Sequence, residues 1–257
     1  MVEVTALILT CDEERNIERT LAALSFIKQV VIVDSLSNDT TVELIKRTRP
    51  DATIVARSFD THTQQWNFGL DQVQTEWVLT LDADYELSPE LQREIVELSP
   101  APDLVGYTAE FEYRIFGYSL RASSYPPRVF LFRTRRARYV DDGHTQSLRP
   151  DGPVKTLASK IYHDDRKPLS HWIRSQDRYS QIEGRHLLAT PDSQLSCQDR
   201  LRKKIYFAPI AMFLYLLIGR GLILDGWRGW YYVMQRTIAE MLLSLRLLTE
   251  KESLRES

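Results

Sequence analysis

The sequence predicts an α/β fold, and two of its features carry that prediction. Over residues 1–98, short and almost wholly apolar runs alternate with segments whose apolar residues recur at helical spacing. Apolar runs of this kind are typical of parallel strands that are covered on both faces. With 257 residues, 43% hydrophobic and 26% charged, the chain is long enough for one large globular domain and an appendage.

The order of these elements predicts a parallel sheet with crossover helices. Strands are expected at residues 4–9, 30–33, 53–56 and 77–81. Helices are expected at 17–24, from Thr40, at 64–72 and from Ser88. Thr40 to Glu43 has the pattern of a capping box, and Ser88 followed by Pro89 is typical of an N-cap and a first helical position. Ligands of such sheets bind at the carboxyl ends of the strands.

Carboxylates gather at those strand ends. Glu13 follows the first strand, Asp34 ends the second, and Asp82 and Asp84 end the fourth as an Asp-Ala-Asp tripeptide. Taken singly, each motif is also compatible with a helix cap or a chance match. Together they predict a crevice in which hard oxygen ligands hold a divalent cation, which in turn neutralises a diphosphate.

These motifs also resemble a known family in their order and spacing. The matching strings are Leu7-Ile8-Leu9-Thr10 with Glu13-Glu14-Arg15-Asn16-Ile17, Val31-Ile32-Val33-Asp34-Ser35, Asn67-Phe68-Gly69-Leu70, and Trp77 to Asp84. They look like a family 2 glycosyltransferase of GT-A fold, a Rossmann-like nucleotide-sugar-binding domain. Further matches at Arg128 to Phe132, His144, His163 and Leu224-Asp225-Gly226 are similar to the bacterial lipopolysaccharide-core β-glucosyltransferases.

The resemblance implies roles for individual residues. Thr10, Glu13, Asp34, Asn67 and Asp82 would bind the nucleotide sugar, with Asp34 accepting a hydrogen bond from a uracil N–H. Asp84, with Asp82 in the metal shell, would bind Mn²⁺ or Mg²⁺. The family is inverting: an acceptor hydroxyl attacks the anomeric carbon while the cation stabilises the departing nucleoside diphosphate.

At the position of the general base, this chain departs from the resembled branch. Where that branch has His-Glu, the chain has His144-Thr145, with Asp141 and Asp142 just upstream. We assign the base to Asp142 first and Asp141 second, with His144 orienting the acceptor or the base. Alternatively, Asp141-Asp142-Gly143 is only a turn. Tyr85 is a second departure, since relatives often have glutamate directly after the Asp-x-Asp motif, and Glu86 is a candidate to replace it.

Residues 99–165 are expected to form the acceptor half, with strands at 105–113, 129–132 and 154–161. Arginines cluster there, at 128, 133, 135, 136 and 138. Arginine forks suit phosphate, so Arg128 is assigned to a phosphorylated or lipid-linked acceptor; a strand edge guarded by charge is the plainer alternative. No nucleic-acid motif accompanies the charge, so nucleic-acid binding ranks last. His163 is expected to close a hydrogen-bond network rather than to bind metal.

Residues 166–257 are expected to form a helical extension to the GT-A domain of residues 1–165. Cations at 200–204 precede Ile205 to Ile218, an apolar run of fourteen residues. Such a run is too short to span a bilayer, and the surrounding Trp and Tyr favour the membrane interface. A stripe on the last helix is expected to join the core in the simplest case, or to face a partner copy or lipid: Met234, Ile238, Met241, Leu242, Leu245 and Leu248.

Charge is divided unevenly along the chain. Residues 1–100 carry 8 basic and 18 acidic residues, whereas residues 101–257 carry 25 and 17, which favours an anionic surface as the partner of the second part. The start of the chain shows no secretory signal, so we expect a cytoplasmic protein bound peripherally to the inner face of a membrane. A homo-oligomer is possible.

The sequence thus predicts an inverting, metal-dependent enzyme. It would move a sugar, with glucose from UDP-glucose as the leading donor by resemblance, to a saccharide or lipid-linked acceptor in cell-envelope glycan synthesis. The alternatives are transfer to a peptide or another polysaccharide, and a membrane-associated protein that binds a nucleotide sugar without catalysis.

Overall fold

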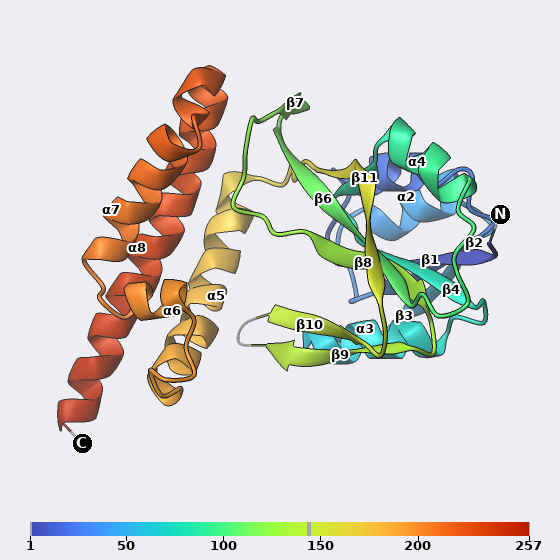
Figure 1. The fold of residues 1–257 in the computed structure, drawn as a ribbon. Coiled ribbons are helices and arrows are strands. Elements are labelled where there is room, and N and C mark those ends of the chain that lie inside the picture. The colour runs from blue at the N-terminus through green and yellow to red at the C-terminus, as the bar shows by residue number, and fades with distance from the viewer. Residues whose placement is uncertain (1, 143–144, 257) are drawn as a thin grey trace. The chain divides into compact units, whose positions relative to one another are not determined.

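The computed structural model describes residues 2–142 and 145–256. The chain divides into two compact units, which are described separately (Figure 1). The first, here called the sheet unit, comprises Met1–Tyr118 and Tyr125–Lys167. The second, the helical unit, comprises Ser119–Ser124 and Pro168–Ser257.

The first half of the sheet unit is a parallel sheet in the order β3-β2-β1-β4. Its strands are β1 (Val4–Thr10), β2 (Gln29–Asp34), β3 (Thr53–Ala56) and β4 (Trp77–Asp82). The helices between and after them are α1 (Ile17–Ala22), α2 (Thr41–Thr48), α3 (His62–Asp71) and α4 (Pro89–Val96). The predicted alternation of parallel strands and helices is confirmed.

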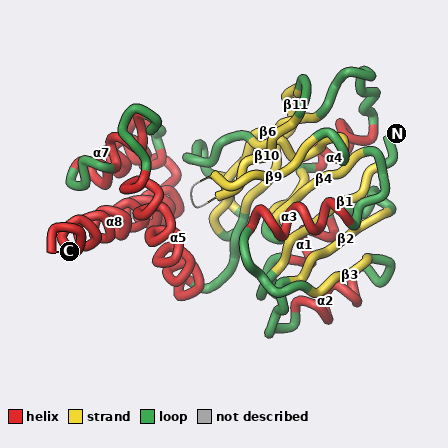
Figure 2. The backbone as a smooth tube through the Cα atoms, turned by 90° about the horizontal axis from the view of Figure 1, so that it is seen from below, coloured by secondary structure: helices red, strands yellow, loops and turns green. Residues whose placement is uncertain are grey.

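Helices cover both faces of this sheet (Figures 1 and 2). Apolar residues of α1, α2 and α4, such as Leu21, Ile45 and Leu91, pack in one core with Ile8 of β1. Residues of α3 pack in a second core on the opposite face, which includes Leu7 of β1. Adjacent residues of one strand therefore face different cores, which is why the strands read as continuous apolar runs.

The two predicted helix starts differ in outcome. Ser88 caps α4, since its hydroxyl accepts from the Leu91 N–H, and this prediction is confirmed. The capping box at Thr40 does not form, because Thr40 makes no side-chain cap hydrogen bond. Asp39 Oδ1 instead accepts from the Thr41 N–H at 2.9 Å, so the acidic side chain just before Thr40 caps the helix.

The rest of the sheet unit extends the same sheet with mainly antiparallel pairs. Beyond β4, the order continues β8-β6-β11-β5, and β7 pairs with β6. The strands are β5 (Tyr85–Leu87), β6 (Gly106–Ile115), β7 (Tyr118–Ser119), β8 (Arg128–Arg133) and β11 (Val154–His163). A separate antiparallel hairpin consists of β9 (Ala137–Asp142) and β10 (Thr145–Pro150). The three strands predicted between residues 105 and 161 are confirmed, whereas β5 and the hairpin were not anticipated.

In the described part of the helical unit, four α-helices are joined through short irregular segments. They are α5 (Leu169–Ala189), α6 (Cys197–Arg202), α7 (Phe207–Leu214) and α8 (Gly226–Glu256), with a π-helix η1 (Tyr215–Gly219) and a 3₁₀-helix η2 (Leu222–Asp225) between the last two. Leu187, Leu195, Ile205, Leu243 and Leu247 form its core. Arg202 of α6 pairs with Glu240 of α8 at 2.8 Å and with Glu183 of α5 at 3.4 Å.

The apolar stripe predicted for the core side of the last helix is largely exposed instead. Met234, Ile238, Met241 and Leu245 face solvent, and α8 buries Leu243 and Leu247 in their place. The core interpretation is therefore wrong for these four residues, whereas Leu248 of the same stripe packs against the core. Among the described residues, no single helix is long and apolar enough to cross a membrane; Phe207–Gly219 and Leu222–Lys251 pass that test only together, as a pair bent by 69°.

Candidate functional site

The loops that follow β1 and β2 are tied together at the carboxyl end of the sheet. Thr10 and Asp34 are register partners at the ends of these strands. Beyond them, the Asp12 N–H donates to Ser37 Oγ at 3.0 Å, and the Asn38 N–H donates to Asp12 Oδ1 at 2.8 Å. Asp12 has a φ of 53°, a left-handed conformation that costs a non-glycine residue energy. The hydrogen bonds hold this loop in a fixed shape.

Asp34 and Thr10 are both buried at this rim. The carboxylate of Asp34 accepts from Ser37, through the hydroxyl at 2.5 Å and the backbone N–H at 3.0 Å. These bonds fix the orientation of the carboxylate and leave lone pairs for a further donor. Thr10 Oγ1 is buried and has no hydrogen-bond partner in the described part of the chain. The rim therefore presents two oriented oxygen groups.

Glu13 belongs to a buried charge cluster next to this rim. Its carboxylate contacts Lys167 Nζ, and its second oxygen accepts from Asn16 Nδ2 at 2.8 Å. Burial would lower the pKa of the Lys167 ammonium, but the charges of Glu13, Asp84 and Asp165 raise it above its ordinary value. Lys167 is therefore a buried cation close to the acidic strand ends.

Asp84 follows β4, in the turn before β5, and contacts a residue of β11, a strand near the other edge of the sheet. Its Oδ2 lies 3.1 Å from Nε2 of His163, the last residue of β11. Burial alone would raise the pKa of the Asp84 carboxyl, but the charge and hydrogen bond of His163, with Lys167 nearby, lower it to about 2. Asp84 is therefore an anion at neutral pH.

The pair Asp84 and His163 has the donor chemistry that a divalent cation needs. Within residues 2–142 and 145–256, no group of three or more His, Cys, Asp or Glu is arranged to hold a metal ion. Mg²⁺ and Mn²⁺ are commonly bound by one or two protein side chains together with substrate phosphates. His163 Nδ1 is buried and without a hydrogen-bond partner among the described residues. A carboxylate and an imidazole thus fit a cation whose remaining ligands come from a diphosphate.

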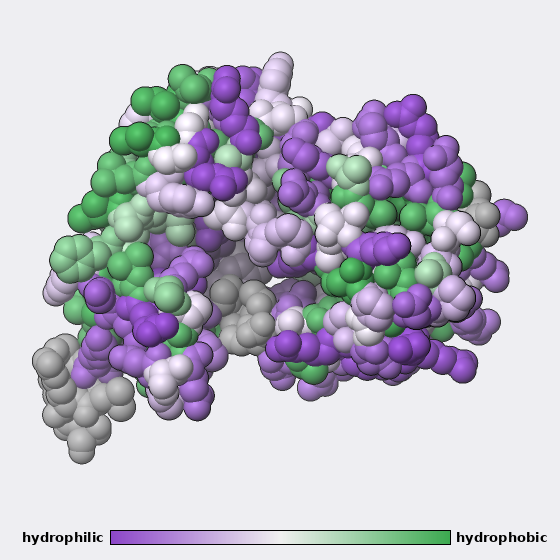
Figure 3. Space-filling view, viewed as in Figure 1, coloured by the Kyte–Doolittle hydropathy of each residue, from purple (hydrophilic) through white to green (hydrophobic). Residues whose placement is uncertain are grey.

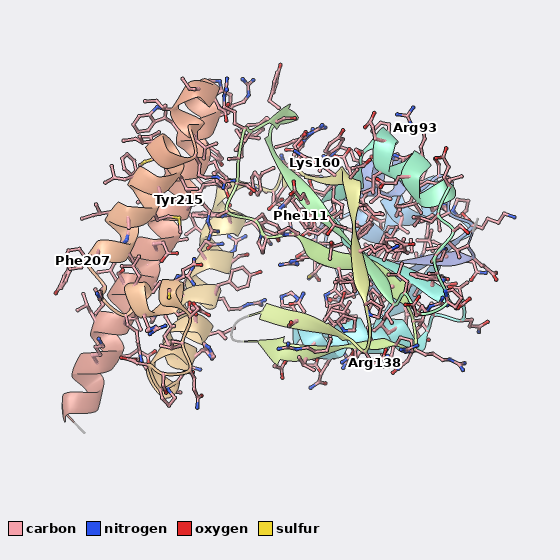
Figure 4. The ribbon with its side chains drawn as sticks, in the orientation of Figure 1. Arg93, Phe111, Arg138, Lys160, Phe207 and Tyr215 are labelled. Atoms are coloured by element: carbon pink, nitrogen blue, oxygen red, sulfur yellow. The ribbon has the colours of Figure 1, made fainter. Side chains whose placement is uncertain are left out.

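A cavity of about 260 Å³ opens beside Asp82. Asp82 Oδ2 lies 3.8 Å from Arg128, whose guanidinium also lies over the ring of Tyr125 at 5.1 Å. Aromatic side chains from four strands and a helix supply much of the wall: Trp66, Tyr85, Phe111, Phe130 and Tyr139. Phe111 on β6 is labelled in Figure 4. Gln146 and Ser147 of β10 also line the cavity.

Trp66 is the wall residue with an unused polar group. It is 3% exposed and stacks on Tyr139, with ring centroids 5.3 Å apart and planes 19° from parallel. Its indole Nε1 is buried and has no hydrogen-bond partner in the described part of the chain. Tyr139 donates from its hydroxyl to Thr80 Oγ1 at 3.0 Å, so that side of the wall is fixed. A buried N–H without a partner costs stability unless a ligand or water accepts from it.

The two residues after the Asp-x-Asp motif point to different places. The Tyr85 hydroxyl lies 2.7 Å from that of Tyr125, and Tyr85 lines the cavity. Glu86 pairs with Arg19 of α1. Successive residues of a strand face opposite sides, so Glu86 does not occupy the position of Tyr85. The phenol pair stands at this wall of the cavity instead of a carboxylate.

Asn67 fastens α3 to the hairpin. Its Nδ2 donates to the Tyr139 carbonyl at 2.9 Å, and its Oδ1 accepts from the Tyr139 N–H at 3.1 Å. It is not among the residues that line the cavity. Its assignment to donor binding stays a prediction, and its visible effect is to hold β9 against the helix that carries Trp66.

The candidate bases lie at the tip of the β9–β10 hairpin. Asp141 is exposed and pairs in register with Gln146, and Asp142 ends β9 opposite Thr145. Both residues therefore belong to a strand, and the turn interpretation of this tripeptide is wrong for them. His144 lies outside the described residues, so its predicted role is untested. Gln146 brings the end of the hairpin to the cavity.

Most of the clustered arginines bind surface carboxylates. Arg133 pairs with Glu76, Arg136 with Asp151 at 2.5 Å, and Arg138, labelled in Figure 4, with Asp71 at 2.9 Å. Arg128 differs, because its side chain lines the cavity. Three of the clustered arginines thus form ion pairs at the surface, and Arg128 belongs to the site.

Three residues at the site were not assigned to it from the sequence: His163, Lys167 and Trp66. Lys167 follows the last strand of the sheet unit, and no local pattern distinguishes it. His163 was expected only to close a hydrogen-bond network, which it does with Asp84. The pairing of β11 with β5 places His163 opposite Tyr85, and no short-range pattern predicts that register.

Comparison with known proteins identifies the family. The model of the glycosyl transferase family 2 matches residues 5–148, more than half of the chain. The chain is 24% identical over 253 residues to "Lipopolysaccharide core biosynthesis glycosyltransferase LpsC" of Rhizobium meliloti, which covers 95% of this chain and 91% of that protein. It is 31% identical over 129 residues to an uncharacterized glycosyltransferase of Rickettsia bellii, covering 50% of this chain and 42% of the relative.

Two solved structures illustrate the structural comparison. The crystal structure of Staphylococcus aureus TarS residues 1–349 in complex with UDP aligns with a TM-score of 0.49 and 13% identity, over 99% of this chain and 92% of that one. Glucosyl-3-phosphoglycerate synthase from Mycobacterium tuberculosis, in complex with phosphoglyceric acid, aligns with a TM-score of 0.49 and 13% identity, over 75% and 82%.

The family match runs from within β1 to within β10, and therefore includes every acidic strand end described above. The predicted fold class, a GT-A α/β domain with an α-helical C-terminal extension, is confirmed by this match together with the observed topology. The chain belongs to glycosyl transferase family 2, and it is a transferase enzyme.

Proposed function

We propose that the protein is an inverting, metal-dependent glycosyltransferase. It transfers a sugar, with glucose from UDP-glucose as the leading donor, to a saccharide or lipid-linked acceptor in cell-envelope glycan synthesis, at the inner face of the membrane. The name of the Rhizobium relative supports the pathway. The observation that carries the proposal is the contact of Asp84 with His163 beside the cavity that Asp82 lines.

The donor nucleotide lies across the ends of β1 and β2 in this proposal. Asp34 accepts from the uracil N–H, and Thr10 and Glu13 face the nucleoside. The support is the burial and fixed orientation of the Asp34 carboxylate and the unpartnered Thr10 hydroxyl at the same rim. Residues 1–98 thus serve the donor, residues 99–165 the acceptor, and residues 166–257 the membrane.

The cation would be Mn²⁺ or Mg²⁺, held by Asp84 and His163 with Asp82 in the surrounding shell. When bound, it neutralises the charge that builds up on the leaving diphosphate. Lys167 supplies a second positive charge in the same region. Its partner Glu13 keeps this cation in place before the donor binds.

The transferred hexose occupies the aromatic cavity in this proposal. Aromatic walls with a few directed polar groups are typical of sites for small ligands. The Trp66 indole N–H donates to a sugar hydroxyl, and Arg128 and Gln146 reach the reacting end. The unpartnered Trp66 Nε1 supports this assignment, because a sugar hydroxyl would accept from it.

The reaction is a single displacement. An acceptor hydroxyl attacks the anomeric carbon, its proton passes to the carboxylate of Asp142, or of Asp141 as the second candidate, and the bond from the anomeric carbon to the diphosphate oxygen breaks. UDP leaves, and the configuration at the anomeric carbon inverts. Both aspartates stand at the end of the hairpin that lines the cavity, which supports a base from this hairpin. Asp141 is the register partner of Gln146, which lines the cavity, so variants of both residues are needed to rank the two candidates.

Calorimetric titration of UDP with and without Mn²⁺ tests the donor and cation assignments. We expect Mn²⁺ to tighten UDP binding in the wild type, and Asp84→Asn and His163→Gln to remove that effect. Asp60→Asn is a matched control, because Asp60 pairs with Arg57 on the surface. UDP binding that is equally tight with and without Mn²⁺ would contradict the metal assignment.

A further inference from the structure

The helical unit exposes a continuous apolar stripe along its longest helix. The exposed residues of α8 recur every three or four positions and so share one side of the helix: Trp227, Trp230, Met234, Ile238, Met241 and Leu245. A surface helix normally buries such a stripe and shows polar residues to solvent. Here α8 already buries Tyr232, Val233 and Leu247. The exposed stripe is therefore additional to the core.

The preceding segment carries a second exposed stripe. On α7 and η1 it consists of Phe207, Ile210, Leu214 and Ile218, again at intervals of three or four, with Tyr206 and Tyr215 beside it. Phe207 and Tyr215 are labelled in Figure 4. The two helices touch through Phe213 and Trp230, whose ring centroids lie 5.9 Å apart. Figure 3 shows hydrophobic residues gathered along the α7 edge of the helical unit.

The charges around these stripes are almost all positive. Residues 200–236 contain seven Lys or Arg and a single acidic residue, Asp225, although Arg202 and Lys203 are already paired with Glu240 and Asp192. Asp225 accepts from the side chain of Arg121 at 3.0 Å, so its charge is compensated. Lys204 and Arg220 are exposed at the two ends of the apolar segment 205–218. Arg228 lies over the Trp227 ring at 4.7 Å, which places a cation directly on the stripe.

We propose that the exposed face of α7, η1 and α8 is a membrane-binding surface that lies in the headgroup region of an anionic bilayer. Apolar and aromatic side chains enter the acyl boundary, and Lys204, Arg220 and Arg228 contact lipid phosphates. The face lies in the plane of the bilayer rather than across it, because α7 and η1 together are too short to span and α8 carries charged residues along its length. The proposal does not rest on the transfer reaction.

An exposed apolar stripe of this kind could also form a dimer interface with a second copy of the chain. Subunit interfaces are enriched in Trp, Tyr, Met and Arg, so these residue types do not by themselves separate the two occupants; what the core of an interface lacks is lysine and an uncompensated surplus of charge. This face instead combines a positive surplus with Trp and Tyr, the residues that concentrate at the level of lipid headgroups. Charge complementarity therefore favours an anionic lipid surface.

The test is co-sedimentation of the full-length protein with vesicles. We expect it to sediment with vesicles of phosphatidylglycerol and phosphatidylcholine, and to bind pure phosphatidylcholine, or any vesicle in high salt, more weakly. The double variant Trp227→Ser/Trp230→Ser, at side chains that are 55% and 42% exposed, should weaken binding by about tenfold or more. The matched control Ile173→Ser/Ile182→Ser alters α5 residues of similar exposure, 48% and 40%, and should bind as the wild type does.

Two further measurements keep the test decisive. Circular dichroism melting shows whether the variants fold, and quenching of wild-type tryptophan fluorescence by brominated phosphatidylcholine in the mixed vesicles needs no variant. Wild-type protein that stays in the supernatant with every vesicle, and shows no quenching, would overturn the proposal. Light scattering provides a second such outcome. If the wild type is a dimer, the double tryptophan variant is a monomer, and lipid leaves the wild-type dimer intact, the face is a subunit interface and the proposal is overturned. Equal loss of binding in the α5 control would also count against this face.

Discussion

Asp84 and His163 lie 79 residues apart in the chain, and their side chains meet at 3.1 Å. Asp84 follows the parallel half of the sheet, and His163 ends β11, the last long strand of the mixed half, which pairs in parallel with β6 and antiparallel with β5. Strand β5, three residues long, connects them, because it begins directly after Asp84 and pairs with the end of β11. The two halves of the sheet unit therefore meet at this pair, and its chemistry depends on the whole sheet being formed.

The low pKa of Asp84 gives stability a defined pH dependence. Its carboxyl has a folded-state pKa of about 2 against an ordinary value of 3.8, so the folded state binds this proton less readily than the unfolded chain. The stability that Asp84 contributes is therefore full above about pH 4 and is lost as the pH falls through about 2. We expect the difference in unfolding free energy between wild type and Asp84→Asn to shrink by about 2 kcal/mol over that range. Urea denaturation at several pH values measures it, and a constant difference would contradict the expectation.

Trp66 tests the sugar cavity. Trp66→Phe keeps an aromatic ring against Tyr139 but removes the buried N–H that we assign to a sugar hydroxyl. We expect kcat/KM for the sugar donor to fall by about tenfold to a hundredfold, in line with the loss of one buried hydrogen bond to a ligand. UDP affinity should be unchanged, since we place the nucleoside at the ends of β1 and β2. A variant with unaltered kcat/KM would remove Trp66 from the sugar site.

The two aspartates at the end of β9 test the base assignment. Asp142→Asn should lower kcat by about a hundredfold or more, because the attacking hydroxyl loses its proton acceptor, while donor binding is retained. Asp141→Asn, on the adjacent residue, is the matched control and should retain most activity. The reverse ranking would transfer the role to Asp141. Full activity in both variants would exclude this hairpin as the source of the base.

Gly69 tests how α3 is seated on the sheet. A Cβ at this position would lie 2.7 Å from Leu7 Cδ1 and 3.2 Å from Val33 Cγ2, both in the core. We expect Gly69→Ala to destabilise the protein by about 1–3 kcal/mol, because the gain in helix propensity does not offset overpacking. Gly184→Ala in α5 is the comparison, since its Cβ would lie 3.2 Å from Arg246 Cγ and farther from every other atom, and it should destabilise the protein less. Thermal unfolding compares them, and equal effects would contradict the close packing of α3.

The parallel half of the sheet could be predicted from the sequence because its signals are local. Each buried strand is a continuous apolar run, and each acidic strand end follows directly, so Asp34, Asp82 and Asp84 could be placed at one edge before any contact was known. The start of α4 was equally local, since Ser88 and Pro89 are adjacent.

The rest depends on contacts between distant segments. The register of β11 against β5 sets the position of His163, and the contacts of Trp66 and Asn67 with Tyr139 join α3 to a distant hairpin. The β9–β10 hairpin itself carries charged and polar residues where strands usually alternate, so its pattern is weak. The stripe on α8 has the periodicity of a core face, and periodicity alone does not say what covers it.

The most direct test of the account is turnover with a panel of nucleotide sugars and Mn²⁺ or Mg²⁺, following release of nucleoside diphosphate from the purified protein. We predict that one UDP-sugar stabilises the protein against heating and is slowly hydrolysed, and that chelation of the cation abolishes both effects. Stabilisation and hydrolysis that survive chelation would contradict the metal-dependent mechanism. A protein that binds none of the nucleotide sugars, with either cation, would contradict the donor site at the ends of β1, β2 and β4.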